Sequence, residues 1–215
     1  MGVTASWAPA AHATLNGPIN GYDCTGITSD AGYQKSGSTV PASLSGTWAS
    51  GALSMNPGKH MWVYAYLDAA SSLNLQDDVI YINDYIWNSN GQIYEQSHVH
   101  WGVANSTGDF YGPVELGSSF TGSFNFHLQY QSNGHYYYSV YLDGALVISN
   151  IDFGPAAPHF GEYGYEMGPD NPCIDMDGTM TVGGSLSGWS VLDSSLYYNV
   201  SQLTSTKFEV YTLSP

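Results

Sequence analysis

The sequence predicts a single all-β domain spanning residues 1–215, an antiparallel β-sandwich of the jelly-roll, concanavalin-like kind. Many short segments alternate apolar and polar residues with the period of two that a strand requires. Tight-turn pairs separate several of these segments, and almost no window of eleven or more residues carries the apolar stripe of a helix. The length of 215 residues suits one domain of this class.

The first 60 residues are rich in Gly, Ala, Ser and Pro, and we expect an irregular covering segment with short strands at 45–48 and 52–55. From residue 61 onward the pattern is that of strands. The expected strands are 62–67, 79–87, 92–103, 122–131, 136–142, 145–148, 161–167, 179–182 and 207–212. The pairs Asn90-Gly91, Asn133-Gly134 and Asp143-Gly144 predict hairpin turns. Only 192–200 has a spacing that also allows a turn of helix.

Charged residues are scarce and mostly of one sign. The chain has 18 acidic residues, three lysines and no arginine, which gives a formal charge of −15. Nucleic acids and anionic membranes are bound through clustered Lys and Arg, so neither is an expected partner. No apolar run approaches the roughly 20 residues of a membrane span. Below about pH 4 carboxylates are neutral whereas bases stay charged, so the scarcity of bases favours an acidic, extracellular setting. A plain polar surface on a secreted protein is the alternative.

The only cysteines are Cys24 and Cys173. Joined as a disulfide, they would close a loop of about 150 residues, worth about 5 kcal/mol in the chain-entropy model. We expect this bond, in keeping with a secreted protein.

Four expected strands carry polar and aromatic side chains on one face. These sets are Tyr81, Asn83, Tyr85 and Trp87 in 79–87; Gln96, His98 and His100 in 92–103; Asn125, His127 and Gln129 in 122–131; and Glu162 and Glu166 in 161–167. Aromatic rings mixed with amides and imidazoles suit a concave groove that binds an extended peptide or glycan. The expected ligand contacts are Tyr81, Tyr85, Trp87, His98, His127 and Glu166. A hydrated outer face is the alternative.

The segment 96–102 (QSHVHWG) contains a His-x-His pair, His98 and His100. Alternation along a strand points both imidazoles the same way, about 6–7 Å apart, as in zinc or copper sites. His127, Glu115 or Glu162 could supply a third ligand. A loose acidic group that could hold calcium, without regular ligand spacing, consists of Asp68, Asp77, Asp78 and Asp84. No cofactor is required, and zinc or calcium is the metal these groups would take.

Several landmarks resemble the glutamic peptidases (the eqolisin family), acid-active enzymes with a β-sandwich fold. Gln96 is followed five residues later by Trp101, and 110–115 (FYGPVE) leads to 161–166 (GEYGYE), whose two glutamates match the family's spacing. The segments 45–48 (SGTW) and 62–63 (WV) are also similar. The resemblance implies that Glu162 is the general base, later acting as an acid, and that the Gln96 amide stabilises the oxyanion.

The resemblance has departures. The stretch between Trp62 and Gln96 is longer than in the family, and a second alignment places Ile82 where the catalytic glutamine belongs. In that alignment the chain lacks the glutamine and is a non-peptidase relative.

The first functional hypothesis is therefore a secreted, acid-active hydrolase that cleaves peptides with Glu162 and Gln96. The second is a lectin-like carbohydrate-binding sandwich, or a glycan-cleaving one in which Glu162 and Glu166 are the paired carboxylates. The third is a structural subunit of a surface layer or filament. The sequence leaves the oligomeric state open.

Overall fold

The computed structural model describes residues 29–69, 76–105, 114–116, 123–132, 136–152, 155–167, 175–193 and 198–212. These residues form fourteen β-strands in two seven-stranded sheets, which confirms the predicted all-β sandwich. The described part of the chain contains no helix that could cross a membrane.

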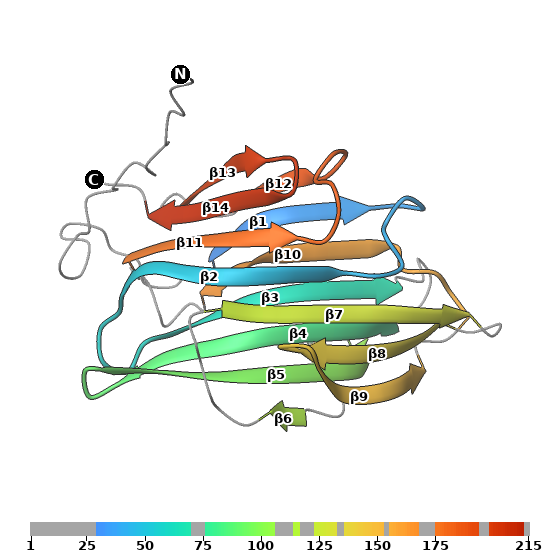
Figure 1. The fold of residues 1–215 in the computed structure, drawn as a ribbon, viewed down its shortest axis with the longest axis horizontal. Helices are drawn as coiled ribbons and strands as arrows, with labels where there is room; N and C mark the ends of the chain where they lie inside the picture. Colours follow the sequence, from blue (N-terminus) through green and yellow to red (C-terminus); the bar gives the residue numbers. More distant parts are fainter. Residues whose placement is uncertain are drawn as a thin grey trace, which may run out of the picture.

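The two sheets lie face to face, and neighbouring strands are antiparallel (Figure 1). Sheet A has the order β12 (Ser190–Asp193), β1 (Ser29–Ser36), β10 (Phe160–Met167), β3 (His60–Ala69), β4 (Gln76–Ser89), β5 (Gln92–Asn105) and β6 (Val114–Leu116). Sheet B has the order β13 (Tyr198–Thr204), β14 (Lys207–Thr212), β11 (Asp175–Val182), β2 (Ser45–Ser54), β7 (Ser123–Ser132), β8 (Tyr136–Leu142) and β9 (Ala145–Asp152).

All expected strands are present, and β8 and β14 match their predicted residues. The two short strands expected at 45–48 and 52–55 form one strand, β2. Four strands, β1, β6, β12 and β13, were not predicted. The described residues of the 192–200 segment belong to β12 and β13, not to a helical turn. Their backbones pair with neighbouring strands, Leu192 with Gly32 and Val200 with Val210.

Two of the predicted hairpin turns are confirmed. Asn90 and Gly91 join β4 to β5 with φ of 55° and 89°, and Asp143 and Gly144 join β8 to β9 with φ of 48° and 78°. Positive φ at both central positions is the requirement of a type I′ turn, which Asn-Gly and Asp-Gly meet at least cost. The predicted Asn133-Gly134 turn and the predicted Cys24–Cys173 disulfide fall outside the described residues.

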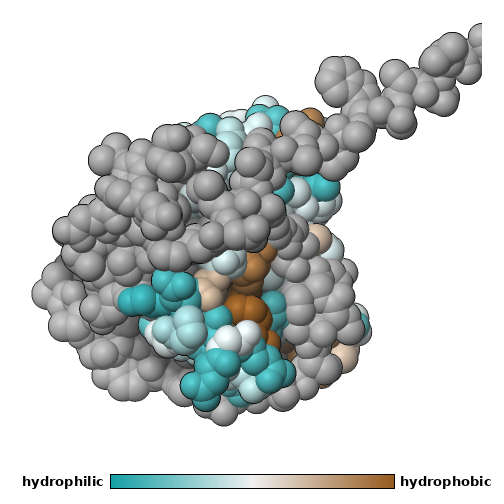
Figure 2. Space-filling model, turned by 90° about the vertical axis from the view of Figure 1, so that its left-hand side faces the viewer, coloured by the Kyte–Doolittle hydropathy of each residue, from teal (hydrophilic) through white to brown (hydrophobic). Residues whose placement is uncertain are grey.

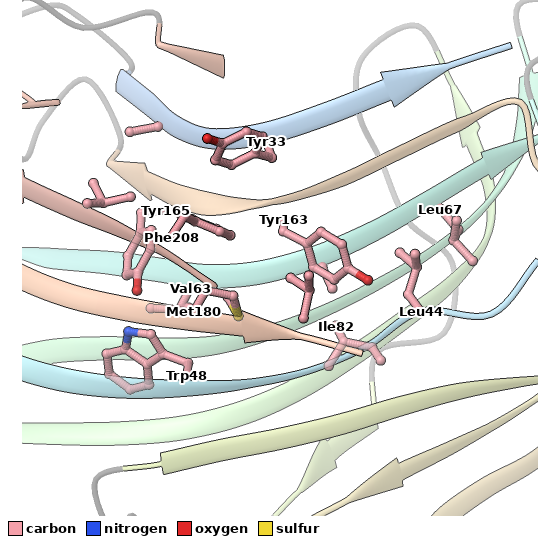
Figure 3. Packing of buried hydrophobic residues seen from close by; sticks show 14 of the residues in the cluster. Tyr33, Leu44, Trp48, Val63, Leu67, Ile82, Tyr163, Tyr165, Met180 and Phe208 are labelled. Atoms are coloured by element: carbon pink, nitrogen blue, oxygen red, sulfur yellow. The ribbon is translucent and has the colours of Figure 1, made fainter. Parts of the chain in front are cut away.

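Apolar side chains from both sheets fill the space between them (Figure 3). Each large side chain buried there stabilises the fold by roughly 1.5–3 kcal/mol. On β10 the core residues are Tyr163 and Tyr165, 3% and 0% exposed. Because successive side chains alternate, Glu162 and Glu166 lie on the opposite face of sheet A. At the end of the molecule seen in Figure 2, apolar residues lie in a hollow flanked by hydrophilic ones.

Two carboxyl groups point into the sandwich. Asp84 stands on the core side of β4 beside Ile82 and Ile86, and Glu95 lies diagonally across from it on β5. Asp84 is 1% exposed, and its Oδ1 accepts a hydrogen bond of 3.4 Å from Ser97. Oδ2 of Asp84 and Oε2 of Glu95 are buried, and neither atom has a hydrogen-bond partner among the described residues. Burial raises the pKa of Asp84 to about 7; burial and the charge of Asp84 raise the pKa of Glu95 to about 9.

These carboxyls predict that the protein is more stable in acid than at neutral pH. In the unfolded chain both ionise near pH 4, whereas in the folded protein they keep their protons to about pH 7 and 9. The folded state therefore binds more protons across this window. The stabilisation is complete below about pH 4 and is lost as the pH rises through the folded pKa values.

Replacing Asp84 by Asn should remove its part of this dependence. We expect Asp84→Asn to raise the free energy of unfolding by roughly 2–4 kcal/mol at pH 8 and to change it little at pH 4. Thermal unfolding followed by circular dichroism at the two pH values checks this. Asp177→Asn, on β11 of sheet B, is the matched control. An equal effect of both substitutions, or a wild-type melting temperature that climbs from pH 4 to pH 8, would contradict the prediction.

Candidate functional site

The candidate site lies on the outer face of sheet A, the face turned away from the core. Five adjacent strands contribute to it, because every second residue of each strand points there. Its main residues are Asp30 and Gly32 on β1; Glu162, Gly164 and Glu166 on β10; Trp62, Tyr64 and Tyr66 on β3; Tyr81, Asn83, Tyr85 and Trp87 on β4; and Tyr94, Gln96 and His98 on β5. Their alternation with core residues is the one that the sequence predicted for β4, β5 and β10.

Three acidic residues form what we term the carboxyl cluster: Asp30, Glu162 and Glu166. Asp30 stands directly opposite Glu166 across the β1–β10 ladder, and Glu162 lies four residues back along β10. Burial raises the pKa of all three carboxyls. For Glu162, burial and the charges of Asp30 and Glu166 together raise the pKa to about 8. The cluster therefore holds protons at a pH where isolated carboxyls have lost them.

Tyrosine hydroxyls from the next two strands contact the cluster. The Tyr64 hydroxyl donates a hydrogen bond to Oε1 of Glu162, and the Tyr81 hydroxyl lies 3.4 Å from Oε2 of Glu166. Tyr64 reaches Glu162 diagonally across the sheet, because its own backbone partner on β10 is Gly164. Tyr64 is only 5% exposed, and burial with the charge of Glu166 raises the pKa of Tyr81 well above its ordinary value. Both hydroxyls therefore remain donors.

Two glycines make this arrangement possible. A Cβ on Gly164 would lie 3.1 Å from the Tyr64 hydroxyl oxygen and 3.1 Å from the carbonyl oxygen of Ala31. Gly32 is paired with Gly164, and a Cβ there would overlap the carbonyl oxygen of Tyr163. The missing side chains let β1 approach β10 closely and let the Tyr64 phenol lie over the strand that carries Glu162.

An amide group lies beside this tyrosine. Asn83 on β4 pairs with Tyr64 on β3 and with His98 on β5. It is 1% exposed although it faces outward, and its Oδ1 has no hydrogen-bond partner in the described part of the chain. A buried acceptor without a donor is costly, so this oxygen calls for an explanation such as a bound ligand. The sequence analysis placed Asn83 on this polar face but did not include it among the expected ligand contacts. The second alignment, at Ile82, came within one residue of it.

An aromatic ladder continues the face beyond the carboxyl cluster. It consists of His60, Trp62, Tyr85, Trp87, Tyr94 and His98. Tyr85 and Trp87 stack at 5.2 Å with 21° between their planes, and Trp87 and Tyr94 stack at 5.5 Å with 19°. Trp62 and Tyr85 are 5.6 Å apart. The rings of Tyr85, Trp87 and Tyr94 thus cover one another's faces, and Tyr94 at the end of the ladder is 40% exposed.

The structure brings most predicted site residues together and separates two. Tyr81, Tyr85, Trp87, His98 and Glu166 share the outer face with Glu162. Gln96 shares it too, but β5 is three strands from β10, about 14 Å at the usual strand spacing. His127 lies on β7 in sheet B, so it does not share this face. The sequence could assign a residue to a face but not to a sheet.

The predicted metal pair stays a prediction. His98 stacks on Tyr85 with ring centroids 6.2 Å apart, and His100 lies two residues further along β5. Among the described residues no group of three or more His, Cys, Asp or Glu is arranged to hold a metal ion. Of the predicted acidic group, Asp84 faces the core, whereas Asp68 on β3 accepts a hydrogen bond of 3.0 Å from Tyr66.

A cavity of about 350 Å³ lies on the other side of β10. The residues lining it include Lys35, Ser45, Tyr163, Gly184 and Trp189. Because Tyr163 points into the core, this cavity is separated from the carboxyl cluster by the sheet itself.

Solved structures with the same fold include glutamic peptidases. A crystal structure of Scytalido-glutamic peptidase with a peptide-based transition state analog is 12% identical, with a TM-score of 0.58 over 86% of this chain and 98% of that chain. The fold is that of the glutamic peptidases. A second structure of that enzyme with a transition state analog inhibitor, 11% identical, has a TM-score of 0.53 over the same shares. SCP-B, a member of the eqolisin family in complex with the tripeptide Ala-Ile-His, is 12% identical with a TM-score of 0.52 over the same shares.

No family model and no curated protein matches the sequence. The likeness to the glutamic peptidases is thus one of fold, which confirms the resemblance at that level. The activity has to be argued from the residues of the outer face.

Gly164 provides a test of how this face is built. We expect Gly164→Ala to displace Tyr64 from Glu162 and to cost about 1–2 kcal/mol of stability, because the new methyl group meets a ring and a backbone oxygen. Gly184→Ala is the control, since a Cβ there meets no atom within 4 Å. Urea unfolding of both variants checks the difference. Equal stability of the two variants would mean that Tyr64 does not need the bare backbone at Gly164.

Proposed function

We propose that the chain hydrolyses an extended peptide on the outer face of sheet A, with Glu162 and Glu166 as the catalytic acid and base. The observation that carries this proposal is the pair of glutamates on one strand, each contacted by a tyrosine hydroxyl and set in a different environment. The fold supports it, because solved structures that share it include peptidases in complex with a peptide-based transition state analog and with a tripeptide. We place the enzyme outside the cell, as the composition suggests.

The environments of the two glutamates assign their roles. Glu162 has a pKa of about 8 and keeps its proton at neutral pH, which suits a general acid. Burial and the charge of Asp30 also raise the pKa of Glu166, but the hydrogen bond from Tyr81 opposes that rise. Glu166 therefore ionises first and suits a general base. Two carboxyls held at different pKa values are a common acid–base arrangement. This reverses the role that the resemblance implies for Glu162.

Hydrolysis then follows in two steps. Ionised Glu166 takes a proton from a water molecule, whose oxygen attacks the peptide carbonyl carbon and gives a tetrahedral oxyanion. Protonated Glu162 gives its proton to the leaving nitrogen as the carbon–nitrogen bond breaks. The net result is one water consumed, one proton gained by Glu166 and one lost by Glu162, and proton exchange with solvent restores both glutamates.

We assign the oxyanion donor to Asn83 in place of Gln96. Asn83 is two strands from β10, about 10 Å at the usual spacing, whereas Gln96 is three strands away. A carbonyl bound above Tyr64 would lie between Glu162 and Asn83. A side-chain amide that donates to a developing oxyanion contributes about 10²–10³-fold to the rate.

The aromatic ladder favours a peptide over a glycan. Sugar-binding platforms present an open ring face, whereas the faces of Tyr85 and Trp87 cover each other. Their edges, with hydroxyl and indole N–H groups, remain for an extended backbone. Carbohydrate binding and self-assembly, the other hypotheses from the sequence, become the alternatives if no cleavage is found.

The two carboxyl roles predict a bell-shaped pH profile. Activity should rise as Glu166 ionises, above its ordinary pKa of 4.5, and fall near pH 8 as Glu162 loses its proton. Cleavage of a denatured protein from pH 2 to 10, followed by mass spectrometry, gives this profile. We expect Glu162→Gln and Glu166→Gln each to lower kcat by about 10²–10⁴-fold.

The control is Glu209→Gln on β14, which removes the same charge from sheet B. A maximum below about pH 5 would restore the base role to Glu162. Absence of cleavage at every pH would overturn the proposed function and turn attention to glycan binding and assembly.

The amide assignment has its own test. We expect Asn83→Ala to lower kcat by about 10²-fold with little change in KM, because an oxyanion donor acts in the transition state. Gln96→Ala should leave kcat within about threefold, since that amide lies too far from Glu162 to share a carbonyl. The reverse order of effects would return the role to Gln96.

A further inference from the structure

We propose that the cavity on the core side of β10 binds a small organic acid, with the carboxylate at Lys35 and the apolar body against Trp189. Sheet A separates this cavity from the carboxyl cluster. The inference therefore goes beyond the proposed hydrolysis and does not rest on it.

The cavity has the size and position of a small-molecule site. Its volume of about 350 Å³ falls within the roughly 300–1,000 Å³ that is usual for such sites. It lies between the two sheets, where β1 and β11 end and β2 begins. Tyr163, 3% exposed, lies at its inner end, whereas Ser43 and Ser185 are exposed. A ligand can therefore enter from solvent and reach buried side chains.

Lys35 supplies the charge of the cavity. Ala31 and Tyr33 of β1 are core residues, so alternation places Lys35 on the same, inward side of the strand. Its side chain is half-buried, and a Cβ on Gly188 would lie 3.7 Å from its Nζ.

No acidic group compensates this lysine. Although the chain has 18 acidic residues, none of the described residues that line the cavity is acidic. Lys35 also has no ion pair within the described part of the chain. An ammonium group on the inward side of a strand, without a counter-ion, favours an anionic ligand.

The other lining groups suit a carboxylate with a short apolar body. Oγ of Ser185 accepts a hydrogen bond of 3.1 Å from the backbone N–H of Ser187, which leaves its own proton to donate. The rings of Trp189 and Tyr163 pack at 5.0 Å with 35° between their planes, and Pro41 adds apolar surface. One cation, a hydroxyl donor and an aromatic wall are the groups that recognise a small organic acid.

The connection between β11 and β12, residues 183–189, is fixed by hydrogen bonds to other elements. The Gly183 N–H donates to the carbonyl oxygen of Ser45 at 2.8 Å, and the Leu186 N–H donates to that of Ser205 at 2.7 Å. Leu186 is 3% exposed and belongs to the core. This wall of the cavity is therefore part of the folded sandwich.

The experiment compares an acid with its neutral isostere. Binding of 3-phenylpropionate and 3-phenylpropionamide to the whole protein is measured by calorimetry at pH 7, where the acid is ionised. N-acetyl-phenylalanine, which presents the same carboxylate as the end of a peptide chain, is measured alongside. In ¹H–¹⁵N spectra the indole signal of Trp189, identified by its loss in Trp189→Phe, locates the ligand.

We expect 3-phenylpropionate to bind about tenfold tighter than the amide, because only the acid forms a charge-assisted hydrogen bond. Lys35→Met should lower the affinity of the acid to that of the amide. Lys207→Met, the same change of charge on sheet B, is the matched control and should alter neither affinity. The acid should shift the Trp189 signal more than the other indole signals. Tighter binding of N-acetyl-phenylalanine than of 3-phenylpropionate would identify the ligand as a peptide end, and the reverse order as a free acid.

Equal affinity for the acid and the amide overturns the proposal, and this comparison needs only the wild-type protein, whatever the stability of Lys35→Met. Absence of binding by both acids at millimolar concentration also overturns it, because Lys35 would then be an ammonium that reaches into solvent. Equal losses in Lys35→Met and Lys207→Met would mean attraction to overall charge. Acid binding that shifts other indole signals and leaves that of Trp189 in place would put the ligand elsewhere. Either of these results rejects the cavity as the site.

Discussion

The alternation of side chains along β10 is the constraint on which the rest of the site depends. Tyr163 and Tyr165 are fixed in the core by contacts with sheet B, and this fixes Glu162 and Glu166 on the other face. A slip of one residue in register would bring the glutamates into the core and expose the tyrosines. The free energy that holds the core therefore also holds the glutamates in place. Their burial among aromatic neighbours then raises their pKa.

Raised pKa values occur on both faces of sheet A. Asp84 and Glu95 on the core side, like the carboxyl cluster on the outer side, hold protons because burial and neighbouring carboxyls disfavour their charged forms. A composition that looks in the sequence like a surface property is thus also a property of buried groups. Because these carboxyls have raised pKa values, both the stability of the fold and the chemistry of the outer face depend on pH.

Local pattern was enough to predict the fold class, most strands and the two faces of β4, β5 and β10. The misses depend on long-range pairing. Strand β1 is polar and contains Gly32, and it forms a strand because β10 and β12 pair with it on both sides. Gln96 was paired with Glu162 because sequence spacing does not reveal that β3 and β4 lie between their strands. Asn83 was placed on the polar face but not among the ligand contacts, since its burial depends on neighbours such as Tyr64 from other strands.

The aromatic ladder has a consequence for how tightly this face can bind. Its rings pack against one another across β3, β4 and β5, tilted between Trp62 and Tyr85 and stacked from Tyr85 to Tyr94, so their rotamers are restricted before any ligand arrives. Ordering a mobile side chain at an interface costs about 0.5–1.5 kcal/mol. Here that entropy is lost during folding, and a ligand lying across the ladder meets a preorganised surface.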